Sequence, residues 1–376
     1  MKKKQILSYL LIIFIYSIIG FSMAYLSRPY ISYIFNESDH SISMIMIKLV
    51  MIMVCVLASF FLQIIIHESG HLVFGSLSGY TFSSFRIGKF MWMNTGDSIQ
   101  LKRLTLAGTG GQCLMAPPDD WKNTPVFLYN MGGCLMNIIS SLLFMTLWYI
   151  LDKTSIITVF FGITSVIGLA FAFTNGVPLK LSNINNDGSN ALETMRDVDA
   201  RHAFWLQLKQ AQMQTQGYRL CEVPEEYFEI PENANMKNSL ITTLVVLKIQ
   251  RMMDLHNFDE ALVVIEKVLS IDSGLIGIHR AMLTCDGMYC HLLKEGRDTD
   301  VSPLHTKFMN QYFKQMSDNP SVIRTLYAEA ALYHNDISTT SKLLEKFEKV
   351  AQTYPYTSEI ESERELINIV KEKSGF

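Results

Sequence analysis

The chain has 376 residues, long enough for two domains; 49% of them are hydrophobic and only 18% are charged. A formal net charge of −3 gives no electrostatic reason to expect a nucleic-acid partner. The six cysteines show no C-x-x-C spacing, which argues against a disulfide framework and indicates reduced thiols. Nearly all charge-free stretches lie before Pro178, and the remainder is typical of a charged, helical soluble domain.

Four apolar stretches predict membrane-spanning helices. The first, 5–27, follows three lysines and is too long for a signal-peptide core, so we expect a helix whose N-terminus is cytoplasmic. The second begins near Met44 and continues towards Gly79, and the third and fourth cover 124–151 and 154–177. This alternation predicts a multi-pass protein of the cell membrane with both termini in the cytoplasm.

The second stretch carries the sequence His67-Glu68-Ser69-Gly70-His71 directly after an uncharged run. Residues four apart share one face of a helix, so His67 and His71 can present two imidazoles to one Zn²⁺. Glu68 can reach a water on that metal as general base. Ionisable groups at membrane depth are costly and usually functional, which favours a zinc hydrolase over a chance match.

A catalytic zinc normally has three protein ligands, so two histidines leave one ligand to be found. The fourth apolar stretch should return to the side of the membrane on which the histidines lie, and Asp187 follows it. Asp187 is therefore the leading third ligand, and Glu193 and Asp197 are the alternatives.

Two further segments carry polar or glycine-rich patterns. Residues 85–92 and 98–105 predict a β-hairpin that either dips into the membrane, with an open edge for an extended peptide, or lies on the surface. In the third apolar stretch, Gly132-Gly133 permits close helix packing. Asn137 there is a candidate either for a substrate carbonyl or unwound backbone, or for a bond between helices.

Beyond about residue 190 the chain predicts soluble helices after a linker at 217–235. The segments 256–262 and 333–336 resemble the turns of tetratricopeptide repeats, which predicts a helical-pair solenoid. Such a domain would bind a peptide, a partner or the substrate, or would simply steady the membrane part. We therefore divide the chain into 1–43 (first helix and external loop), 44–190 (core), 191–235 (connecting helix and linker) and 236–376 (cytoplasmic helical domain).

The core resembles the site-2 protease family of intramembrane zinc metalloproteases, over roughly 44–190. The resemblance rests on His67 to His71, on the glycine-rich segment with Asn137, and on Asn175-x-x-Pro178 followed by Asp187-Gly188. It implies zinc held by His67, His71 and Asp187, water activated by Glu68, and substrate contacts at Asn137, Asn175 and Pro178. It also implies a re-entrant β element. Two features depart from the family: eight residues separate Pro178 from Asp187, where four are usual, and Cys134 follows Gly133, where proline is usual.

Together these features predict a mainly α-helical, polytopic membrane bundle with a small β-hairpin and a cytoplasmic helical domain. The predicted function is zinc-dependent cleavage of a peptide bond in or next to a membrane segment of a regulatory protein or small peptide precursor. The expected partners are that substrate, the lipid bilayer and a protein or peptide ligand of the C-terminal domain. The alternative is a membrane scaffold that binds peptides and retains a vestigial metal site.

Overall fold

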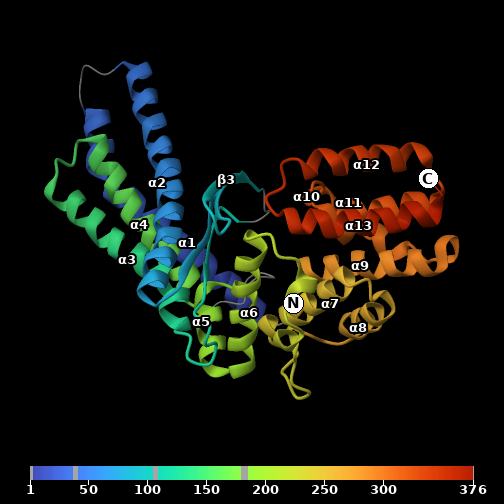
Figure 1. Ribbon diagram of the computed structural model, residues 1–376. Coiled ribbons are helices and arrows are strands. Elements are labelled where there is room, and N and C mark those ends of the chain that lie inside the picture. Colours follow the sequence, from blue (N-terminus) through green and yellow to red (C-terminus); the bar gives the residue numbers. More distant parts are fainter. Residues whose placement is uncertain (1–2, 37–40, 105–108, 179–184, 376) are drawn as a thin grey trace. The chain divides into compact units, whose positions relative to one another are not determined.

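The computed structural model describes residues 3–36, 41–104, 109–178 and 185–375, and of residues 3–12 only the backbone. The chain is mostly helical, with one small sheet, and divides into two compact units. The first comprises Met1–Gly79 with Pro125–Met195, and the second Tyr80–Thr124 with Arg196–Phe376. Figure 1 shows the elements of both units, coloured along the sequence.

The first unit is a helical bundle. Its elements are α1 (Lys3–Asn36), α2 (Ile42–Leu77), α3 (Val126–Ile150), α4 (Ile156–Gly176) and α5 (Asp187–Arg196). Helices α2, α3 and α4 pack against one another, and α1 packs mainly on α4 (Figure 1). Within the described residues, α2, α3 and α4 are long and apolar enough to cross a membrane. That α1 is a fourth membrane helix stays a prediction.

Helices α2 and α3 approach closely because glycines face each other at their crossing. A Cβ at Gly70 would collide with the carbonyl oxygen of Gly132, and one at Gly132 would lie 2.6 Å from that of Gly70. Small residues at such a crossing let two backbones come together, as the glycine pair in the sequence predicts.

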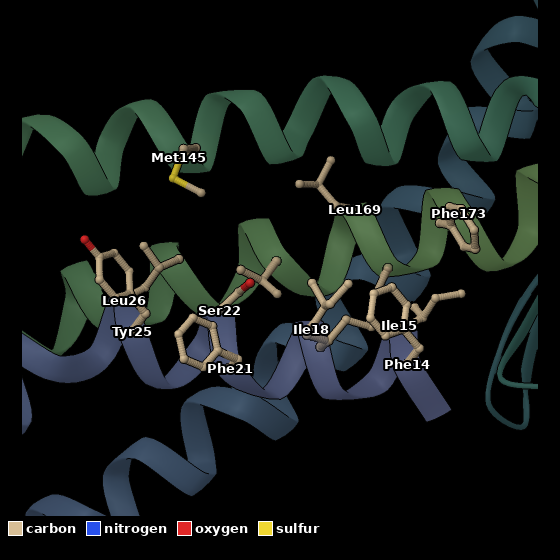
Figure 2. A pocket seen from close by; sticks show the side chains of 13 residues that line it. Phe14, Ile15, Ile18, Phe21, Ser22, Tyr25, Leu26, Met145, Leu169 and Phe173 are labelled. Atoms are coloured by element: carbon tan, nitrogen blue, oxygen red, sulfur yellow. The ribbon is translucent and has the colours of Figure 1, made fainter. Parts of the chain in front are cut away.

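An apolar groove of about 580 Å³ lies on the first unit between α1 and the pair α3 and α4. Figure 2 shows its walls, with Phe14 and Ile18 from α1 near Leu169 and Phe173 from α4, and Tyr25 at the end where Met145 lies. Exposed apolar side chains of this kind suit a surface that lies in hydrocarbon rather than in water.

The second unit begins with a four-stranded antiparallel sheet in the order β3-β2-β1-β4. The strands are β1 (Thr81–Ile87), β2 (Phe90–Asn94), β3 (Ile99–Arg103) and β4 (Gly111–Ala116). The expected single strand over 85–92 is wrong, because the chain turns at Gly88, whose φ of +57° suits glycine, and pairs Ile87 with Phe90. Strand β3 lies within the expected strand 98–105. That this sheet dips into the membrane stays a prediction.

The rest of the second unit is helical. Its helices are α6 (Val198–Thr215), α7 (Ser239–Asp254), α8 (Phe258–Ser270), α9 (Gly277–Glu295), α10 (Lys307–Gln315), α11 (Pro320–Ala328), α12 (Ile337–Ala351) and α13 (Thr357–Ser374), with short turns η1 (Leu220–Glu222), η2 (Glu225–Phe228), η3 (Gly296–Asp298), η4 (Ser302–His305) and η5 (Glu329–His334). Helix α6 packs on the sheet, where Trp205 Nε1 donates to the carbonyl of Pro118 over 2.7 Å.

The two segments expected to be turns between paired helices do separate helices. Residues 255–257 join α7 to α8, and His256 has φ of +61°. Asn335, with φ of +53°, lies between η5 and α12, and Asp336 caps α12 by accepting from Thr339 N. Helices of this part pack around a shared apolar core. The assignment to tetratricopeptide repeats stays a prediction.

Candidate metal centre

The two histidines of the motif lie one turn apart on α2 and point to the same place. His67 and His71 are 7% and 8% exposed, and their Nε2 atoms are 3.3 Å apart. They face α3 and α4 rather than the outside of the bundle. The polar residue Gln63, one turn before His67, is fully buried on the same side of α2. The i, i+4 spacing therefore produces the pair of converging imidazoles that the sequence predicts.

Asp187, the first residue of α5, completes the group. Its Oδ2 lies 3.0 Å from Nε2 of His67 and 3.5 Å from Nε2 of His71. A tetrahedral zinc ion with ligands at about 2.0 to 2.1 Å needs ligand atoms about 3.3 Å apart. Within the described part of the chain, these three residues form the one group with the spacing of a metal site. The donor set and its distances therefore fit a zinc ion.

Each imidazole is oriented by a second hydrogen bond. Nδ1 of His67 donates to Oδ1 of Asn137 over 2.6 Å, and Nδ1 of His71 donates to the carbonyl oxygen of Tyr129 over 2.8 Å. Because both acceptors are oxygens, each ring carries its proton on Nδ1, and both Nε2 lone pairs point towards Asp187. Partners of this kind fix the tautomer and ring orientation of histidines that bind metals.

Asn137 links this arrangement to the interior of the bundle. Its Nδ2 donates to the backbone oxygen and to Oε1 of Gln63, over 3.1 and 2.7 Å, which fixes the orientation of the amide. Gln63 in turn donates to the carbonyl of Thr164 on α4 over 3.0 Å. The amide of Asn137 thus joins helices and orients a histidine, which supports the helix-linking interpretation. Its expected contact with substrate stays a prediction.

Asp187 is held in place by its two neighbours in sequence. Nδ2 of Asn186 donates to the carbonyls of Thr174 and Val177, at the end of α4, over 2.9 and 2.6 Å. Oδ1 of Asn186 accepts from Ser189 N, which caps α5. Gly188 lies so close to Gly176 that a Cβ would collide with the Gly176 carbonyl oxygen. These contacts set Asp187 beside the histidines, while residues 179–184 of the longer connection lie outside the described residues.

The other predicted residues have different surroundings. Glu68 is partly buried and directly follows His67 on α2. Nδ2 of Asn175 donates to the Phe171 carbonyl of its own helix over 3.0 Å, and Pro178 is exposed just after α4. The roles of Asn175 and Pro178 in substrate binding stay predictions.

The two alternative ligands are engaged elsewhere. Glu193 accepts from Asn185 over 3.0 Å, and Asp197 caps α6 by accepting from the backbone nitrogens of Asp199 and Ala200. Neither belongs to the group of three ligand atoms.

Sequence reasoning missed several residues that support the ligands. Gly133 packs directly against the ring of His67, because a Cβ at this position would lie only 2.6 Å from the ring. Sγ of Cys134 lies 3.8 Å from Oδ2 of Asp187. Asn186 and the carbonyl of Tyr129 were also not anticipated. The spacing of Gly133 and Cys134 from Asn137, four and three residues on one helix, is the signal that could have placed them together.

One of the three comparisons with known proteins gave a match. The family model of peptidase family M50 matches residues 55–358, which include all three ligand candidates and Glu68. No curated protein and no solved structure gave a match to the chain.

Proposed function

The chain belongs to peptidase family M50, a family of intramembrane metalloproteases, and from that membership we propose that it is a zinc endopeptidase of the site-2 type. The observation that carries the proposal is the set of three ligand atoms 3.0, 3.3 and 3.5 Å apart, with both histidines oriented through Nδ1. Without a cation, two lone pairs and a carboxylate oxygen would repel one another at these distances unless a ring took up a proton.

His67, His71 and Asp187 would hold the ion. When bound, zinc supplies a Lewis acid that polarises the scissile carbonyl and makes a water acidic enough to be deprotonated near neutral pH. Two neutral imidazoles and one carboxylate leave the site a net charge of +1, which stabilises negative charge developing on a carbonyl oxygen.

Glu68 is the general base in this proposal. It directly follows the ligand His67 on α2, so it is close to the metal site although it is not one of the three ligands. It would accept a proton from the attacking water and return it to the amine that leaves. Its partly buried position favours this exchange, because fewer water molecules compete for the proton.

The substrate in this proposal is a peptide bond in or next to a membrane segment of a regulatory protein or small peptide precursor. Two of the ligands, His67 and His71, lie on α2, which is long and apolar enough to span a bilayer, and this supports a substrate presented at membrane depth. A helical substrate must unwind first, because its carbonyls are engaged in hydrogen bonds. Strand β3 is an exposed edge of the sheet as far as residues 81–104 and 109–116 describe it, and the backbone of such an edge can pair with an extended chain.

The decisive experiment compares wild type, Glu68→Gln and the matched control Glu361→Gln in detergent with a membrane-anchored reporter peptide. We expect Glu68→Gln to lose at least a hundredfold in turnover while it binds as much zinc as wild type. Glu361 is exposed on α13, and its variant should cleave normally. A chelator should abolish cleavage, and zinc should restore it.

Cleavage by Glu68→Gln at the wild-type rate would refute the role of Glu68. Wild type and Glu361→Gln that contain no zinc after dialysis against a zinc buffer would refute the metal site and favour a membrane scaffold with a vestigial site. The zinc content is measured on the same samples by elemental analysis, so the two outcomes are distinguished.

A further inference from the structure

The helical part of the second unit contains a polar cavity that the peptidase chemistry does not use. Its volume is about 320 Å³, within the range of sites for small ligands. Residues of α6, α7, α9, α11 and α13 form its walls, together with the segment between α6 and α7. Helices far apart in the sequence thus converge on one cavity.

The walls carry four carboxylates and two guanidinium groups. Asp254 accepts from Nε and Nη2 of Arg219 over 3.1 and 2.7 Å. Asp286 and Glu363 accept from Nη2 and Nε of Arg324 over 2.6 and 2.9 Å. Three of the carboxylates therefore form ion pairs with arginines in the same walls.

Glu359 is the fourth carboxylate and forms no ion pair within the described part of the chain. It accepts hydrogen bonds from Tyr354 Oη over 3.1 Å and from Gln214 Nε2 over 3.2 Å, and both donors are neutral. Burial and the charge of Glu363 together raise the pKa of Glu359 to about 7. The cavity is thus left with a carboxylate that lacks a cation.

Arg324 provides a second, independent sign of a ligand. Its side chain is 1% exposed and lines the cavity, yet its Nη1 has no hydrogen-bond partner. A buried donor of this kind is normally satisfied, because leaving it unpaired costs free energy. An oxygen atom of a ligand would provide the missing acceptor.

The walls also carry uncharged side chains, both polar and apolar. Leu247, Met282, Met316 and Leu366 line the cavity beside the polar groups. We propose that the cavity binds a primary ammonium group on an aliphatic stem, with Glu359 as its counter-ion and Nη1 of Arg324 as donor to an oxygen of the same ligand. A lysine residue of a peptide has this chemistry, whereas a free alkylamine lacks the oxygen.

The test is calorimetric titration of the purified full chain in detergent with three probes. Nα-acetyl-lysine methylamide carries the ammonium group and peptide oxygens, pentylamine carries the ammonium group alone, and Nα-acetyl-norleucine methylamide has the stem without the charge. We expect the lysine probe to bind at least tenfold more tightly than the norleucine probe. Weaker binding of pentylamine than of the lysine probe would support the contact between Arg324 and a ligand oxygen, and equal binding would overturn that contact.

Two variants complete the test. Glu359→Gln keeps the shape of the side chain and removes its charge, so it should weaken binding of the lysine probe at least tenfold. Glu361→Gln, two residues along α13 and exposed, should bind as wild type does. Equal binding of the lysine and norleucine probes to wild type, or no binding of the lysine probe at millimolar concentration, would overturn the proposal. That comparison decides the question even if Glu359→Gln does not fold.

Discussion

Replacing Gly133 by alanine tests how closely α3 supports the metal ligands. The added Cβ would lie 2.6 Å from Cε1 and Nε2 of His67. Because ordinary contacts of a carbon atom are about 3.5 to 4.0 Å, the ring would have to retreat by about 1 Å. A displacement of about 1 Å at a catalytic group costs on the order of a hundredfold in rate. A disturbed ligand costs about ten- to a hundredfold in metal affinity.

The assay is competition for zinc against a chromophoric chelator, followed by cleavage of the reporter peptide at saturating zinc. The matched control is Gly20→Ala in α1, where a Cβ would meet no atom within 4 Å. We expect the control to keep wild-type affinity and turnover, because alanine also has the higher helix propensity. Wild-type zinc affinity and turnover in a folded Gly133→Ala protein would refute the close contact between α3 and His67.

Three further predictions follow from the structure. Asn137→Ala removes the oxygen that accepts the hydrogen bond from the His67 ring, so the zinc affinity of this variant should fall by about ten- to a hundredfold in the chelator competition. An unchanged affinity would show that the hydrogen bond does not orient the ring. Gly188→Ala forces a Cβ against the Gly176 carbonyl and should lower zinc affinity by at least tenfold by displacing Asp187; zinc binding equal to that of wild type would contradict this account of how α5 is held. Burial raises the pKa of Glu359 to about 7 in the folded protein, so the folded state keeps a proton that the unfolded state releases. The free energy of opening of α13 should therefore fall by at most about 3 kcal/mol as the pH rises from about 4.5 to about 7. Hydrogen exchange should show this decline in wild type and its loss in Glu359→Gln, whereas an equal decline in both would exclude Glu359 as its source.

Several elements of the fold could be predicted from local sequence. The uncharged run before His67 predicted a helix from about Met44 to Gly79, and α2 covers Ile42–Leu77. The sheet was predicted less well: the alternation of residues 85–92 indicated one strand, but Gly88 turns the chain there, and β4 was not anticipated. Strand β4 forms because its backbone pairs with β1, and the local sequence of β4 does not identify that partner.

The sequence by itself determined the half of the metal site that one helix contains. His67, Glu68 and His71 have a fixed relation because a helix repeats every 3.6 residues, so their spacing alone brings the two rings together. The choice of Asp187 over Glu193 and Asp197 required the tertiary structure, since it depends on Asn186 and Gly188 attaching α5 to the end of α4.

The same distinction holds for the supporting residues and for the second unit. From the sequence, Asn137 could be either a substrate contact or a link between helices. Only the tertiary structure identifies Gln63 and His67 as the hydrogen-bond partners of its amide. The cavity around Glu359 leaves no mark in the sequence, because its walls come from helices far apart along the chain. Local periodicity fixes what one helix presents, whereas the partner of a buried polar group depends on which helices pack beside it.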